Sequence, residues 1–133
     1  MAIHRLSGRI IRQLQPCLLL EDSSIVLLDL EQTVRALGLT DVQAVTSIPQ
    51  ARHALNTRTM RSAVLDIQIY NAPSVDIAID LAKCGAAIVF VTGYSTKLTL
   101  PPELAHVNVL SKPTDPAMII SALVAALGAD CMD

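Results

Sequence analysis

The chain consists of two alternating kinds of segment, which differ in how their apolar and polar positions are spaced. Short runs of consecutive aliphatic and β-branched residues predict buried strands, and they occur at residues 18–20, 42–45, 63–67, 87–91 and 107–110. Longer segments between the runs place apolar residues three or four positions apart, which is the helical period. Helix-capping residues precede these segments and glycines follow them: Ser23 or Ser24, Ser47 with Pro49, Ser74, and Asp115 with Pro116 at the starts, and Gly38, Gly85 and Gly128 at the ends. The pattern therefore predicts strands that alternate regularly with helices.

This alternation predicts an α/β fold. A strand followed by a helix, repeated five times, requires a parallel sheet with right-handed crossovers and helices on both faces. We therefore expect a flavodoxin-like five-stranded parallel sheet, (βα)5, over residues 17–128, with a C-terminal tail at 129–133. The pattern weakens between residues 94 and 106, where Pro101 and Pro102 would interrupt a helix, so only a short or distorted helix is predicted there.

Residues 1–16 have a pattern of their own. Ile3, Leu6, Ile10 and Leu14 recur at helical spacing among three arginines, and Pro16 ends the segment. This indicates a short amphipathic N-terminal extension. Such a helix either covers the domain as a lid or serves as a dimerisation or partner helix, and the sequence leaves both interpretations open.

Composition narrows the class of protein. The chain has 133 residues, which suits one domain, and it is 52% apolar but only 2% aromatic, so the core must be aliphatic. A net charge of −2 gives no general attraction to nucleic acid, and no apolar stretch is long enough to span a membrane. Cys17, Cys84 and Cys131 have no disulfide-like or zinc-like spacing. We therefore expect a soluble cytoplasmic protein with buried, reduced thiols.

Polar residues stand where four of the predicted strands end. Glu21 and Asp22 follow the first strand, Asp66 the third, Thr92 the fourth and Lys112 the fifth. In a parallel sheet these positions converge on the crevice outside the carboxyl ends of the strands. Three carboxylates, a hydroxyl and an ammonium suit a divalent cation together with a phosphoryl group. The sequence therefore predicts a phosphoryl-accepting site.

The order of these residues resembles the receiver domain of two-component response regulators, and the resemblance covers residues 17–127. Four phrases carry it: Leu19-Leu20-Glu21-Asp22, Val64-Leu65-Asp66-Ile67, Phe90-Val91-Thr92-Gly93-Tyr94 and Leu110-Ser111-Lys112-Pro113. Each phrase alone is common, but four in this order at receiver-like spacing are specific. The Thr-Gly-Tyr sequence is similar to that of an atypical subgroup of stand-alone receivers.

The resemblance implies a role for each site residue. Asp66 matches the phosphoacceptor, which receives its phosphoryl group from a histidine kinase or phosphotransfer protein. Asp22, Asp66 and the backbone carbonyl of Gln68 match the positions that hold Mg²⁺, with Glu21 acting through a bound water. Lys112 and Thr92 match the residues that contact phosphoryl oxygens, and Lys112-Pro113 matches a cis peptide bond. Phosphorylation would then change the surface that a downstream protein contacts.

The chain departs from the usual receiver sequence at the residues that rearrange on phosphorylation. Many receivers have an aromatic residue three positions before the lysine, and this chain has Val109 there. We therefore hypothesise that Gly93 and Tyr94 rearrange instead. Gly93 would supply backbone freedom, and Tyr94 would supply the aromatic ring that changes its exposure. Gln68 and Tyr94 also match positions that govern access of water to the acyl phosphate.

Other functions on similar folds fit less well. A Mg²⁺-dependent aspartyl phosphohydrolase of the haloacid dehalogenase type opens with its nucleophile in a DxDxT phrase, whereas here the acidic pair comes first. A flavin carrier needs a hydroxyl- and glycine-rich phosphate loop where this chain has Glu21 and Asp22. A pseudo-receiver, which binds partners without phosphorylation, normally lacks site residues. We therefore expect a signalling domain and not an enzyme. Its expected partners are other proteins or a second copy of this chain, and no nucleic-acid binding is expected.

Overall fold

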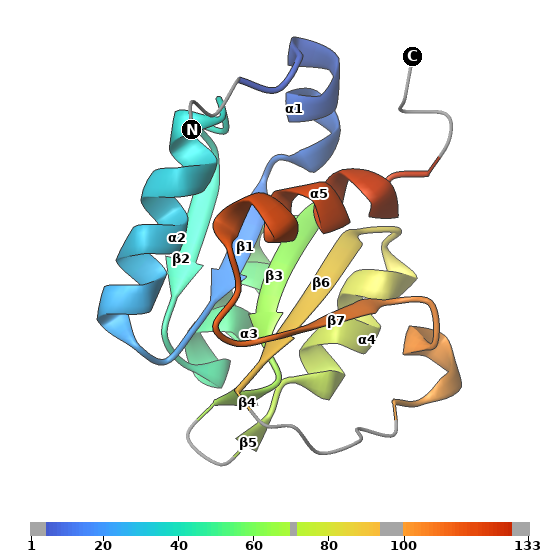
Figure 1. Ribbon diagram of the computed structural model, residues 1–133. Helices are drawn as coiled ribbons and strands as arrows, with labels where there is room; N and C mark the ends of the chain where they lie inside the picture. The colour runs from blue at the N-terminus through green and yellow to red at the C-terminus, as the bar shows by residue number, and fades with distance from the viewer. Residues whose placement is uncertain (1–4, 70–71, 94–99, 129–133) are drawn as a thin grey trace.

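The protein is built around one five-stranded parallel sheet (Figure 1). The computed structural model describes residues 5–69, 72–93 and 100–128. The strands are β1 (Cys17–Leu20), β2 (Val42–Val45), β3 (Ser62–Asp66), β6 (Ala87–Thr92) and β7 (Asn108–Ser111), in the spatial order β2-β1-β3-β6-β7. This is the predicted flavodoxin-like arrangement, and β3 lies at its centre.

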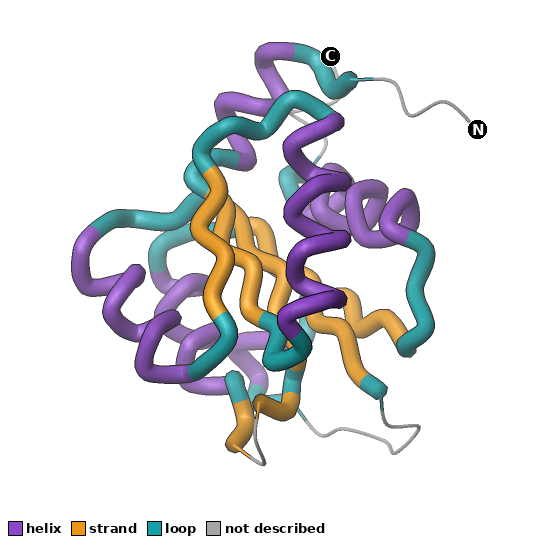
Figure 2. Tube along the Cα trace, turned by 90° about the vertical axis from the view of Figure 1, so that its left-hand side faces the viewer, coloured by secondary structure: helices purple, strands orange, loops and turns teal. Residues whose placement is uncertain are grey.

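Helices cover both faces of the sheet (Figure 2). The first face carries α1 (Gly8–Leu14), α2 (Ser24–Ala36) and α5 (Pro116–Ala126), and the second carries α3 (Ile48–Thr57), α4 (Val75–Lys83) and the 3₁₀ helix η1 (Pro102–Leu104). The helix η1 stands in the segment where a short or distorted helix was predicted. No helix in the described residues is long and apolar enough to cross a membrane.

A small antiparallel hairpin follows β3. It consists of β4 (Gln68–Ile69) and β5 (Ala72–Pro73), in which Gln68 pairs with Pro73 and Ile69 with Ala72. The sequence pattern did not predict this hairpin, because two-residue strands are too short to show an alternation of apolar and polar positions. The hairpin matters because it begins two residues after Asp66.

Side chains of the strands alternate between two cores. Leu18 and Leu20 pack with α3 and α4, whereas Cys17 and Leu19 pack with α2 and α5. Phe90, the only phenylalanine of the chain, is fully buried in the core on the α3 and α4 side. Both faces of the central strands are therefore dry, and the polar residues at their ends are held on a rigid base.

The N-terminal helix packs against the domain. Leu14 of α1 is fully buried, and the side-chain oxygen of Gln15 accepts hydrogen bonds from the amides of Thr40 and Asp41. Gly38 ends α2 with a φ of +117°, and a Cβ there would lie only 2.5 Å from a side-chain carbon of Ile11. Glycine thus allows α1 to lie close to α2, and α1 packs against the domain.

The expectation of buried thiols holds for Cys17 and is wrong for Cys84, while Cys131 lies outside the described residues. Cys84 follows the last residue of α4, and the turn that ends this helix places it on the surface. Cys17 lies on β1 beneath α2 and α5, and burial raises the pKa of its thiol to about 11. The two cysteines therefore differ in access, and the buried Cys17 thiol stays protonated at neutral pH.

We expect this difference to decide their reactivity. In folded protein at pH 8, N-ethylmaleimide should modify Cys84 and leave Cys17 unmodified, because the thiolate is the nucleophile and Cys17 is both protonated and buried. Peptide mass mapping after brief labelling measures each site, and labelling in urea is the control in which both react. Equal labelling in the folded protein would contradict the buried position of Cys17.

Candidate functional site

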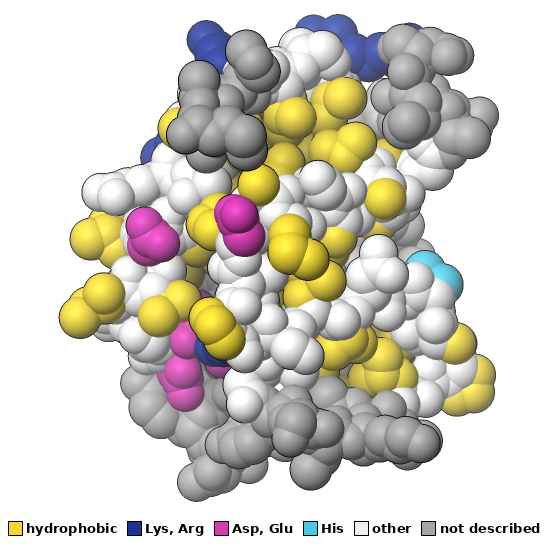
Figure 3. All heavy atoms as spheres, viewed as in Figure 1, with side chains coloured by type: hydrophobic (Ala, Val, Ile, Leu, Met, Phe, Trp, Pro, Cys, Tyr) yellow, Lys and Arg dark blue, Asp and Glu magenta, His cyan; other side chains and the backbone are white. Residues whose placement is uncertain are grey.

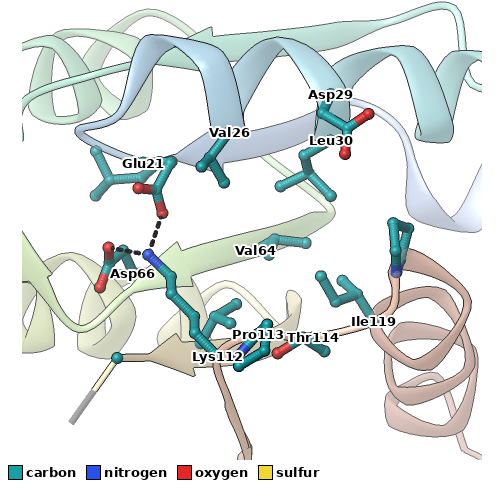
Figure 4. Close-up of a pocket in the computed structure, with 14 residues that line it drawn as sticks. Glu21, Val26, Asp29, Leu30, Val64, Asp66, Lys112, Pro113, Thr114 and Ile119 are labelled. Carbon is teal, nitrogen blue, oxygen red and sulfur yellow. Dashed lines mark hydrogen bonds and ion pairs between the residues drawn. The ribbon is translucent and has the colours of Figure 1, made fainter.

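Residues from three strand ends meet at the carboxyl edge of the sheet. Glu21 follows β1, Asp66 is the last residue of β3 and Lys112 follows β7. The Lys112 ammonium nitrogen Nζ lies 2.7 Å from Glu21 Oε2 and 2.8 Å from Asp66 Oδ2 (Figure 4). Both carboxylates are buried, with Glu21 5% and Asp66 6% exposed. The Lys112 ammonium therefore forms ion pairs with two of the predicted carboxylates, those of Glu21 and Asp66.

Asp22 brings a third carboxylate to this cluster. One oxygen from each of Glu21, Asp22 and Asp66 lies within 4.8 Å of the other two. Oxygen-only donors of this kind are the ligands of hard cations such as Mg²⁺ and Ca²⁺. Gln68, whose backbone carbonyl was predicted as a ligand, opens the hairpin directly beyond Asp66. The chemistry of this donor set therefore fits a hard divalent cation.

Burial and ion pairing shift the pKa values of Glu21 and Lys112. Burial raises the pKa of Glu21, and the hydrogen bonds from Lys112 and from the backbone amide of Ser23 offset part of that rise. Burial alone would lower the pKa of Lys112, but the hydrogen bonds to Asp66 and Glu21 outweigh it, so the pKa of Lys112 is raised. Lys112 is therefore a fixed positive charge at neutral pH.

Thr92 stands at the end of β6 and is buried. Its backbone carbonyl accepts a hydrogen bond from the Lys112 amide at 2.7 Å, so the Thr92 and Lys112 backbones are directly connected. Val109, which takes the place of the usual aromatic residue, is 38% exposed on the edge strand β7. Tyr94 lies outside the described residues, so the hypothesis of a Tyr94 switch stays a prediction.

A cleft of about 410 Å³ opens beside the ion pairs (Figure 4). Apolar side chains of α2, the sheet and α5 line it, including Leu30, Val64 and Ile119. In Figure 3, acidic side chains gather around a basic one near the lower edge of the same face, next to exposed hydrophobic side chains. The cluster is therefore reachable from one side of the molecule.

One residue that contacts Asp66 was not predicted to lie at the site. Ser74 was predicted only as the cap of α4, but its hydroxyl donates a hydrogen bond to the backbone carbonyl of Asp66 at 2.8 Å. A serine before a helix gives no sign of the direction of its hydroxyl, which depends on the strand beside it. The structure also contains the cis peptide bond between Lys112 and Pro113 that the resemblance implied.

Known structures similar to this chain include receiver domains. A response regulator receiver protein from Sinorhizobium medicae is 27% identical, with a TM-score of 0.72 over 85% of this chain and 94% of that one. SdrG from Sphingomonas melonis is 26% identical, with a TM-score of 0.72 over 87% of this chain and 98% of that one. These similarities confirm the predicted resemblance to response regulator receiver domains.

A more distant structure shares the fold. A response regulator protein from Burkholderia pseudomallei, with a phosphorylated aspartic acid, a calcium ion and citrate, is 19% identical, with a TM-score of 0.70 over 86% of this chain and 67% of that one. No protein-family model matches the chain, and no curated protein is significantly similar to it.

Proposed function

We propose that this receiver-like chain takes a phosphoryl group onto the Asp66 carboxylate from a histidine kinase or phosphotransfer protein and acts as a phosphorylation-dependent signalling domain. The observation that carries the proposal is the position of Lys112, whose ammonium bridges Glu21 and Asp66 at the end of the central strand. Oxygens of Glu21, Asp22 and Asp66 lie within 4.8 Å of one another beside it, so the site has groups for both the phosphoryl group and a cation.

The reaction is a displacement at phosphorus. An oxygen of Asp66 forms a bond to phosphorus while the bond between phosphorus and the donor's imidazole nitrogen breaks, and the nitrogen keeps the electron pair. The main obstacle is repulsion between an anionic nucleophile and an anionic phosphoryl group. Lys112, 2.8 Å from Asp66, supplies a positive charge at this point, and its raised pKa keeps that charge through the neutral range.

A divalent cation would supply further charge neutralisation. Asp22, Asp66 and the backbone carbonyl of Gln68 are the groups that would hold Mg²⁺, and Glu21 would contact it through water. Oxygen ligands with a partly retained hydration shell are what Mg²⁺ requires. A response regulator from Burkholderia pseudomallei with the same fold contains a calcium ion and a phosphorylated aspartic acid, which supports a divalent cation as the cofactor.

The signal arises from the added charge. A phosphoryl group carries about −1.5 to −2 charges at pH 7. Lys112 and the Thr92 hydroxyl are the groups that would bind its oxygens, and their backbones are hydrogen-bonded to each other. A movement of either residue would therefore also move the ends of β6 and β7 and the surface around them. We expect a protein partner to bind at this surface.

Labelling with a small phosphodonor tests the proposal. Protein incubated with acetyl phosphate and Mg²⁺ should gain the mass of one phosphoryl group, and the gain should disappear when EDTA replaces Mg²⁺. The product should be labile to hydroxylamine, as acyl phosphates are. Protein that gains no mass would instead favour a phosphorylation-independent binding module. Sustained hydrolysis of p-nitrophenyl phosphate would favour an aspartyl phosphohydrolase.

A further inference from the structure

The hydroxyl of Ser74 has an unusual direction for a residue at the start of a helix. At the starts of α2, α3 and α5, the side-chain oxygens of Ser23, Ser47 and Asp115 accept hydrogen bonds from backbone amides of their own helices. Ser74 makes no such capping bond with α4. Its hydroxyl points back to β3, where it donates a hydrogen bond to the Asp66 carbonyl at 2.8 Å.

A second hydrogen bond ties Ser74 to the same strand end. The Ser74 amide donates to the Ile67 carbonyl at 2.9 Å, and the side chain is fully buried. The segment between Ile67 and Ser74 holds the hairpin in which Gln68 pairs with Pro73. Ser74 therefore closes the base of this hairpin with two hydrogen bonds to consecutive carbonyls.

We propose that Ser74 is a positioning residue for the phosphoryl-accepting site, an inference that rests on the proposed function. Its hydroxyl fixes the peptide plane between Asp66 and Ile67. That plane sets both the direction of the Asp66 carboxylate and the start of the hairpin that carries the Gln68 carbonyl. Ser74 itself touches neither the phosphoryl group nor the cation.

The physical reason is the loss of a buried hydrogen bond at the end of β3. The Asp66 carbonyl has a partner in the Ser74 hydroxyl, and Asp66 itself is buried. Without that hydroxyl the Asp66 carbonyl loses a buried hydrogen bond, and the peptide is held less firmly in its plane. Because the Asp66 carboxylate and the Gln68 carbonyl are proposed ligands of one ion, a small rotation between them would spoil the geometry that Mg²⁺ demands.

Ser62 provides a matched control. It is also fully buried, it also belongs to β3, and its hydroxyl also donates to a backbone carbonyl, that of Leu14. It lies at the opposite end of the strand from Asp66. Replacing either serine by alanine removes a buried hydrogen bond to a backbone carbonyl, but only Ser74→Ala does so at the site.

The experiment compares wild type, Ser74→Ala and Ser62→Ala, at a temperature where circular dichroism shows all three folded. Mg²⁺ affinity is measured by titration with amide NMR shifts as the readout, and the labelling rate with acetyl phosphate is measured at saturating Mg²⁺. We expect Ser74→Ala to weaken Mg²⁺ binding about 10-fold to 100-fold, the range found for groups that orient metal ligands. Ser62→Ala should bind Mg²⁺ as the wild type does.

Each outcome decides one question. Equal Mg²⁺ affinity in Ser74→Ala and wild type would overturn the positioning role, as would an equal loss in both variants. A specific loss of affinity in Ser74→Ala, with no labelling of the wild type by acetyl phosphate, would overturn the proposed function and keep the role of Ser74 in the cation site. Wild type that neither binds Mg²⁺ nor accepts a phosphoryl group would overturn both.

Discussion

Replacing Asp66 with Asn is expected to reduce phosphoryl labelling by acetyl phosphate to background. The amide is a poor nucleophile, and Asp66 is the carboxylate that ends the central strand in contact with Lys112. The fold should remain, because Lys112 keeps its ion pair with Glu21 at 2.7 Å. Intact mass spectrometry measures the labelling, and circular dichroism confirms that the variant is folded.

Asp80→Asn is the control for this change. Asp80 lies on α4 outside the acidic cluster and forms an ion pair with Arg52 on the surface. Since exposed ion pairs contribute about 0–1 kcal/mol to stability, this variant should fold and label like the wild type. Labelling of Asp66→Asn at the rate of Asp80→Asn would show that another residue accepts the phosphoryl group.

Replacing Phe90 with Ala is expected to cause a large loss in the free energy of unfolding. Phe90 is fully buried on β6, where it pairs in register with Leu65 of β3. Truncation of a buried phenylalanine costs about 3–5 kcal/mol, compared with a total stability of about 5–15 kcal/mol for a typical domain. Urea unfolding measures the loss, and with a slope of about 1–3 kcal/mol/M the midpoint should fall by roughly 2 M.

Ile25→Ala is the matched surface control, because Ile25 is 82% exposed on α2. Its stability should change by about 0.5 kcal/mol or less. A midpoint for Phe90→Ala within the error of Ile25→Ala would contradict the position of Phe90 in the core. Because β6 ends at Thr92, two residues beyond Phe90, Phe90→Ala should also weaken phosphoryl labelling.

The sheet and the composition of the site could be predicted because each depends on local chemistry. Strands of a buried parallel sheet must be continuous apolar runs, so Leu65 and Phe90 lie in the strands where the pattern placed them. Parallel strands carry their last residues to one edge. For that reason Asp66 and Lys112, which are far apart in the sequence, could be expected to meet.

Other features depend on tertiary contacts that leave no local pattern. The direction of the Ser74 hydroxyl is decided by the strand end beside it and not by its own helix. The hairpin at Gln68 is held by hydrogen bonds across two residues, too few for a periodic signal. Cys84 is exposed because a turn follows α4, whereas the same residue type at Cys17 lies beneath two helices.

The most direct measurement of the central claim is chemical mapping of the phosphorylated residue. Borohydride reduces an acyl phosphate to an alcohol, so a phosphorylated aspartate becomes homoserine, which peptide mass spectrometry locates. After treatment with acetyl phosphate and Mg²⁺, followed by borohydride, we predict homoserine at position 66. Homoserine at another aspartate, or none at position 66 in protein that has gained a phosphoryl group, would contradict the assignment of Asp66 as the phosphoacceptor.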